Sequence, residues 1–110
     1  MATLSIISYN VNGIRAAIRK GFLEWLKTKP ADIICLQETK ALKEDVDAAV
    51  FAQCGYESHW FSAQKKGYSG VAVLSAVKLD RIVYGNGHGK SDDEGRVIQV
   101  DVGSIRIINA

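Results

Sequence analysis

The stretch SIISYNVNGIRAAIRKGFLEWLKTKPADIICLQETK, residues 5–40, decides the fold of this chain. Residues 3–9 are mostly apolar, which predicts a strand buried on both faces, as in the centre of a sheet. Apolar residues at spacings of three and four predict a helix over residues 14–28, which Gly21 can divide in two. Residues 32–37 are a second apolar strand candidate. Strand, helix and strand in this order predict a βαβ unit with parallel strands.

The rest of the chain adds one helix and several strands. A second amphipathic helix is predicted over residues 44–54, with Gly55 as its C-terminal cap. After it, the apolar period changes to two. The strand candidates are YESHWF, GVAVLS, LDRIVYG, GRVIQVDV and SIRIINA. Gly103 and Ser104 separate the last two, which predicts a tight hairpin turn with glycine first. We therefore expect an α/β fold of packed sheets with helices outside.

Composition is typical of one globular domain. The chain has 110 residues, of which 47% are hydrophobic and 24% charged, and a net charge of +2. No apolar run approaches a membrane span, and no signal peptide is evident, so we expect no membrane partner and a cytoplasmic location. Cys35 and Cys54 lack metal-site spacing and are read as small buried side chains. The chain stops inside a strand pattern, so we expect residues 1–110 to be the N-terminal portion of a longer single domain.

Oxygen-bearing side chains follow the two predicted parallel strands. Asn10 ends the first strand and Glu38 follows the second, and ligands of open α/β sheets bind at such carboxyl ends. Mg²⁺ prefers a carboxylate with neutral oxygens and waters. Glu38 is then the direct ligand, and Asn10, with Asn12, offers an amide oxygen or binds a metal-bound water. In the alternative, Asn10 satisfies loop backbone, Asn12 and Gly13 form a turn, and Glu38 caps the next segment. Spacing alone leaves both interpretations open.

Three other groups of residues say less about the chemistry. Basic residues concentrate in the first two thirds of the chain, as either a phosphate-facing surface or a solvated one. The glycine-rich stretch YGNGHGK, residues 84–90, is followed by acidic residues and a strand rather than a helix, so we expect no nucleotide cofactor. His59 falls in a strand pattern and His88 in this glycine-rich stretch, and neither is expected to act in catalysis.

Four motifs resemble a known family. SYNVNGIRAA, ADIICLQETK, KKGYSGVAVLS and DDEGRVIQVD occur in the order, and roughly at the distances, found in the exonuclease III family of apurinic/apyrimidinic DNA endonucleases. LQETK after an apolar strand resembles the wider endonuclease/exonuclease/phosphatase superfamily of metal-dependent phosphoesterases. The first and third motifs favour its DNA-repair branch. The resemblance implies the N-terminal part of a four-layer α/β sandwich, with two packed mixed β-sheets flanked by helices.

The resemblance also implies roles for individual residues. Glu38 corresponds to the family's metal-binding glutamate, and Asn10 to the asparagine that lines the metal site. Asn12 stands where some relatives have aspartate, and Arg96 matches a position near the site to which we assign no role. The positions matching those that contact the DNA backbone in relatives are Arg15, Lys20, Lys40, Gly67 and Tyr68.

The implied activity is hydrolysis of phosphodiester bonds in duplex DNA, 5′ to an abasic site or at a 3′ end, by a protein that is monomeric at full length. The implied cofactor is Mg²⁺, with Mn²⁺ as a substitute. The family's remaining catalytic residues, a tyrosine, an Asp-x-Asn pair, an aspartate and an Asp-His pair, lie beyond the position of Ala110, so we expect the isolated chain to be inactive. Two alternatives stay open: a superfamily phosphatase acting on lipid or inositol phosphates, and a non-catalytic binding fragment.

Overall fold

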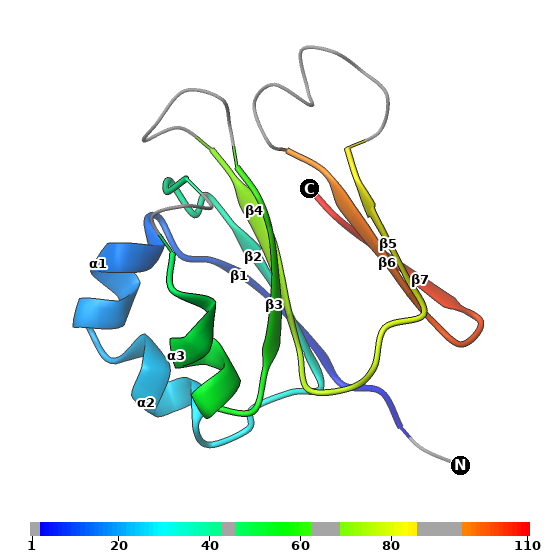
Figure 1. Cartoon of the computed structure of the whole chain (residues 1–110), viewed down its shortest axis with the longest axis horizontal. Coiled ribbons are helices and arrows are strands. Elements are labelled where there is room, and N and C mark those ends of the chain that lie inside the picture. The colour runs from blue at the N-terminus through cyan, green and yellow to red at the C-terminus, as the bar shows by residue number, and fades with distance from the viewer. Residues whose placement is uncertain (1–2, 43–45, 63–68, 86–95) are drawn as a thin grey trace.

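The computed structural model describes residues 3–42, 46–62, 69–85 and 96–110. Helices and strands alternate first, and strands follow (Figure 1). The elements are β1 (Ile6–Asn10), α1 (Ile14–Arg19), α2 (Phe22–Leu26), β2 (Ile33–Gln37), α3 (Ala48–Gln53), β3 (Glu57–Phe61), β4 (Val71–Ser75), β5 (Arg81–Tyr84), β6 (Ile98–Val102) and β7 (Ile105–Asn109). Within these described ranges, no helix is long and apolar enough to cross a bilayer.

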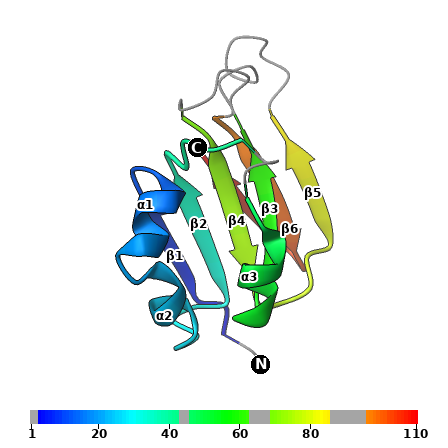
Figure 2. The same cartoon turned by 60° about the vertical axis from the view of Figure 1, so that its left-hand side comes forward.

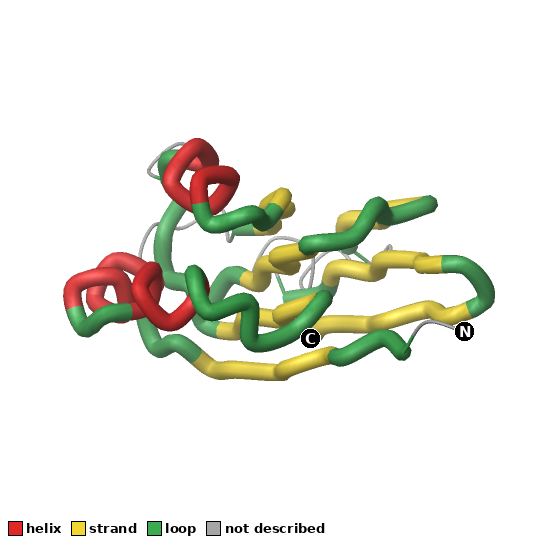
Figure 3. Tube along the Cα trace, turned by 90° about the horizontal axis from the view of Figure 1, so that it is seen from below, coloured by secondary structure: helices red, strands yellow, loops and turns green. Residues whose placement is uncertain are grey.

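The strands form two sheets in the described part of the chain. The four-stranded sheet has the order β1-β2-β4-β3, and the three-stranded sheet has the order β5-β6-β7. β1 and β2 are parallel, from Ile6 opposite Ile33 to Asn10 opposite Gln37, which confirms the predicted βαβ unit. The other strand pairs are antiparallel. The helices cover one face of the larger sheet, as Figures 2 and 3 show, and the smaller sheet lies on the other face (Figure 1).

Glycines set the helix boundaries. Gly21 has a φ of 102° and divides the predicted helix over residues 14–28 into α1 and α2. Gly55, with a φ of 88°, ends α3: its N–H donates to Ala52 O and the next N–H, of Tyr56, donates to Phe51 O. These two bonds are the Schellman pattern that satisfies the last carbonyls of a helix. The prediction placed the start of this helix too early, and residues 43–45 lie outside the described part.

The start of α3 is set by a side-chain cap. The Asp47 carboxylate accepts a hydrogen bond of 3.0 Å from the Ala49 N–H, which satisfies one of the free donors of the first turn. The predicted hairpin turn between β6 and β7 is also confirmed. Gly103 has a φ of 57°, whereas Ser104 is not among the positive-φ residues, as in a turn with glycine first.

The core has two parts, one on each face of the larger sheet. Aromatic side chains, among them Phe22, Phe51 and Trp60, fill the space under the helices. Between the sheets lie Ile33, Cys35, Val71, Val73, Ile98 and Val100. Cys35 and Cys54 are both buried and free, as predicted.

The prediction that the first strand is buried on both faces is wrong. β1 is an edge strand, and its residues Ile6 and Tyr9 are 45% and 44% exposed. The smaller sheet packs on β2 and β4, whose side chains are mostly buried, and does not cover β1. An apolar sequence therefore identifies β1 as a strand without making it central or buried on both faces.

Candidate functional site

The carboxyl ends of β1 and β2 bring Asn10 and Glu38 together. The Asn10 Nδ2 group donates a hydrogen bond to Glu38 Oε2. Its amide oxygen accepts a hydrogen bond of 3.0 Å from the Asn12 N–H, which turns the chain at the end of β1. The Glu38 side chain is 47% exposed, so its carboxylate is held on one side and open to solvent on the other.

The loops that carry these side chains are tied to one another by backbone hydrogen bonds. The Gly13 N–H donates to Glu38 O at 2.7 Å, and the Lys40 N–H donates to Ser69 O at 2.7 Å. Five non-glycine residues of the described part have a positive φ, and four of them lie here: Asn12 (47°), Glu38 (52°), Lys40 (53°) and Ser69 (42°). This backbone conformation is unfavourable for side chains with a Cβ, and it persists where surrounding contacts determine it.

Lys40 joins the two loops through its side chain. Its Nζ donates a hydrogen bond of 2.5 Å to Asn12 Oδ1 and lies 3.9 Å from Glu38 Oε1. Both the Lys40 and the Glu38 side chains are partly exposed, so their electrostatic attraction is screened by water. The ammonium group thus places a positive charge beside the carboxylate without closing the site.

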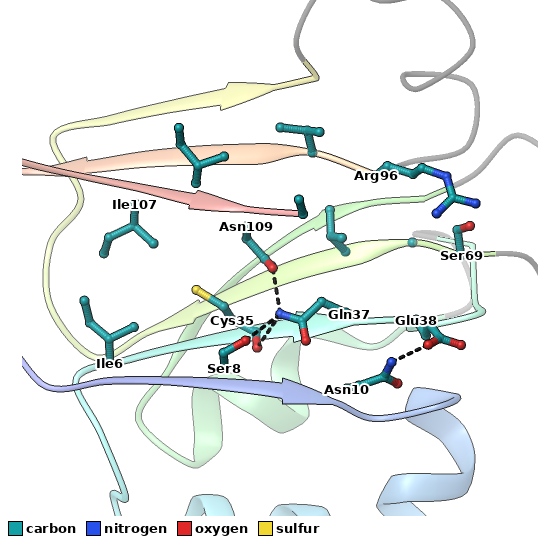
Figure 4. Close-up of a pocket in the computed structure, with 15 residues that line it drawn as sticks. Ile6, Ser8, Asn10, Cys35, Gln37, Glu38, Ser69, Arg96, Ile107 and Asn109 are labelled. Atoms are coloured by element: carbon teal, nitrogen blue, oxygen red, sulfur yellow. Dashed lines mark hydrogen bonds between the residues drawn. The ribbon is translucent and has the colours of Figure 1, made fainter.

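A pocket of about 880 Å³ opens between the two sheets beside Glu38 (Figure 4). Ser69 and Arg96 lie at the same end of the pocket as Asn10 and Glu38. Cys35 also lines it, and burial raises the pKa of the Cys35 thiol, so this group stays protonated near neutral pH and is not activated as a nucleophile.

The sequence analysis missed the polar residues deeper in this pocket. Gln37 Nε2 donates to Asn109 Oδ1 at 2.8 Å and to Ser8 Oγ at 3.0 Å. Asn109 is only 2% exposed although its side chain is polar. The available signal was a polar residue at an inward position of an otherwise apolar strand, in DIICLQ and in SIRIINA.

The structure places three of the five predicted DNA-contacting residues at two depressions. Arg15 and Lys40 line one of about 390 Å³, together with Arg19, which the sequence analysis did not single out. Arg15 and Arg19 are one helical turn apart, a spacing that places them on one face of α1. Lys20 lines a neighbouring depression of about 490 Å³, together with Asn12. Gly67 and Tyr68 lie outside the described residues.

The donor groups beside the pocket, one carboxylate and one amide, are of the kind that Mg²⁺ accepts. The described residues contain no group of three or more His, Cys, Asp or Glu side chains able to hold a metal. Mg²⁺ is often bound by one or two carboxylates, with waters and substrate phosphate oxygens completing its shell. Glu38 supplies such a carboxylate beside an open pocket, and Asn10 holds one of its oxygens.

The comparisons with known proteins agree with this geometry. The model of the endonuclease/exonuclease/phosphatase family matches residues 7–110, and the chain belongs to this family. An exodeoxyribonuclease of Bacillus subtilis (strain 168) is 44% identical over 106 residues, which cover 96% of this chain and 41% of that protein.

Solved structures extend the likeness to the fold. An AP endonuclease from Archaeoglobus fulgidus superimposes with a TM-score of 0.84 and 32% identity, over 98% of this chain and 40% of that one. The 3′ phosphatase NExo from Neisseria, bound to a product DNA hairpin, gives a TM-score of 0.85 and 29% identity, over 98% and 41%. The chain thus spans about two fifths of these relatives. The predicted resemblance to the exonuclease III family and the α/β sandwich fold are confirmed.

Proposed function

We propose that this chain is the N-terminal part of a Mg²⁺-dependent nuclease that hydrolyses phosphodiester bonds of duplex DNA, at abasic sites or 3′ ends. The observation that carries the proposal is the Asn10–Glu38 pair, held at the ends of two parallel strands beside an open pocket. The names of the relatives support it: an exodeoxyribonuclease, an AP endonuclease and a 3′ phosphatase bound to DNA product.

Each residue of the pair has a separate task. Glu38 would hold the ion through its carboxylate, and Asn10 keeps one oxygen of that carboxylate, Oε2, in place. When bound, Mg²⁺ supplies charge stabilisation at the phosphate and lowers the pKa of a bound water. Lys40 links Asn12 to the carboxylate, so the two loops that carry the site keep one geometry. Mn²⁺ is the expected substitute, because it accepts the same oxygen ligands.

The basic residues that line the two depressions give the substrate its orientation. Arg15 and Lys40 border one side of the site and Lys20 borders the next depression. Contacts of such residues with phosphates fix the register of a duplex and supply much of its affinity, whereas they carry no sequence information. This fits a substrate recognised by backbone and by a missing base rather than by sequence. The full-length protein is proposed to act as a monomer.

The test of the reaction uses a chimera, because the 110-residue chain alone is expected to be inactive. In the chimera, this chain replaces the matched part of the Bacillus exodeoxyribonuclease. We expect EDTA-sensitive cleavage of a duplex with one abasic site, and its loss in Glu38→Gln. Cleavage by the isolated chain would contradict the expected inactivity. A chimera that folds but hydrolyses only lipid or inositol phosphates would contradict the proposed substrate.

DNA binding is tested on the isolated chain by fluorescence anisotropy over a salt series. Arg15→Ala and Lys40→Ala should each weaken binding and lower the slope of log K against log salt by about 1. Lys27→Ala is the matched control, since Lys27 follows α2 and lines neither basic depression. Equal effects of all three substitutions would show non-specific charge attraction and remove the support for this surface.

A further inference from the structure

The Asn109 side chain lines the pocket and connects the two sheets there. Its Nδ2 group donates to Leu36 O on β2 at 3.0 Å and to Ala72 O on β4 at 2.8 Å. Its Oδ1 accepts from Gln37 Nε2 at 2.8 Å. A single side chain of the smaller sheet therefore contacts both central strands of the larger one.

An amide at this place needs a reason, because the space between packed sheets is normally filled by apolar side chains. Burying an amide is costly unless its hydrogen bonds are made, and Asn109 makes bonds with both its NH₂ group and its oxygen. A fully satisfied buried polar group restricts the packing to one arrangement more strictly than apolar contacts do. The bonds of Asn109 thus fix how β7 sits on β2 and β4.

Gln37 connects this packing of the two sheets to the Asn10–Glu38 pair. Gln37 lies opposite Asn10 in the β1–β2 register and directly precedes Glu38. Its amide nitrogen donates to Asn109 Oδ1, to Ser8 Oγ on β1 and, at 3.3 Å, to Cys35 O on its own strand. Figure 4 shows Gln37 between these partners and the Asn10–Glu38 pair. These bonds hold Gln37, and the backbone that leads from it directly into Glu38, in one position relative to β1 and β7.

We propose that Asn109 and Gln37 are positioning residues for the Asn10–Glu38 pair. Asn109 fixes the smaller sheet on the larger one and anchors Gln37, so that the end of β2 presents Glu38 to Asn10 in one geometry. The inference rests on the proposed function for the use of Glu38 as a metal anchor. The positioning itself is a property of the folded chain and can be measured without catalysis.

The test follows two NMR signals of the isotope-labelled chain, the Asn10 side-chain NH₂ group and the Glu38 carboxyl carbon, with and without Mg²⁺. In Asn109→Leu we expect both signals to shift in the metal-free chain, and the Mg²⁺-induced shift of Glu38 to be reduced. Gln37→Leu is the second variant, since it leaves the bonds of Asn109 to Leu36 and Ala72 in place and should still fold. It should reproduce the same two changes.

Val100→Ala is the matched control. Val100 is 1% exposed in the same inter-sheet core, and its truncation loosens the packing without touching the amide bonds. We expect it to lower stability and leave both signals in place. Unchanged signals in Gln37→Leu, or equal shifts in Val100→Ala, would overturn the positioning role. A wild-type chain whose Glu38 signal ignores Mg²⁺, while the metal-free shifts of the variants occur, would contradict the metal site and support the positioning.

Discussion

Replacing Gly70 by alanine should destabilise the folded chain at the loop that supports Glu38. Gly70 precedes β4, and its carbonyl accepts a hydrogen bond of 3.1 Å from the N–H of Thr39, next to Glu38. Its φ is 90°, and a Cβ placed there would lie 2.3 Å from Thr39 Oγ1. Thr39 is only 1% exposed, so its hydroxyl has little room to move away. Alanine at position 70 thus meets both backbone strain and a collision.

The two costs can be separated by a second glycine. Gly21 has a φ of 102°, and a Cβ there would meet nothing within 4 Å. Gly21→Ala should therefore carry the backbone cost alone, about 1–2 kcal/mol for a left-handed residue with a Cβ. Gly70→Ala adds the forced shift of packed atoms, about 1–3 kcal/mol. We expect a total of about 2–5 kcal/mol for Gly70→Ala, which is a large share of the stability of a small domain.

Urea denaturation followed by circular dichroism measures both variants against the unaltered chain. The double variant Gly70→Ala with Thr39→Ala should recover part of the loss, because the colliding hydroxyl is gone. If Gly70→Ala is no more destabilising than Gly21→Ala, the collision with Thr39 does not occur and the reasoning is refuted.

Two further substitutions and one chemical modification test other parts of the structure. The Arg106 guanidinium lowers the pKa of Asp101 below its ordinary value of 3.8, so Arg106→Leu should raise it, as a carboxyl ¹³C titration would show. The pair's contribution to stability is present at neutral pH and is lost as Asp101 is protonated. An Asp101 titration that does not change in Arg106→Leu would contradict this role of Arg106. Because burial raises the pKa of the Cys35 thiol, a thiol reagent should modify it slowly until urea unfolds the chain, and fast reaction under native conditions would disprove this. Phe51→Ala removes a fully buried ring beneath the helices and should cost about 3–5 kcal/mol in urea denaturation, whereas a loss below 1 kcal/mol would contradict this packing.

Local sequence patterns were sufficient for the elements and for their order. The apolar period of residues 14–28 and the alternation after Tyr56 predicted the helices and strands, because each pattern reflects contacts made by a single element. Gly21 and Gly55 marked real helix ends because only glycine readily takes a positive φ. The start of α3 was placed too early, since apolar spacing cannot show where a cap such as Asp47 begins the helix.

The sequence was less informative about long-range packing. The apolar run of β1 suggested a central strand, but which strands the smaller sheet covers depends on how two sheets dock. The proximity of Asn10 and Glu38 followed from parallel strands ending at one edge. The bonds of Asn109 to Leu36 and Ala72 join residues more than thirty positions apart, as the separations of 73 and 37 show, and no local pattern predicts them.

The left-handed backbone at Asn12, Glu38, Lys40 and Ser69 sets a conflict for protein engineering. Glycine adopts a positive φ without the steric cost that a Cβ brings, so glycine at a strained position can raise stability. At these positions such a change would relieve strain and at the same time remove a side chain from the site or loosen its loops. Selection for thermostability alone should therefore accept glycine at these four positions, whereas a selection that also demands activity should leave them unchanged.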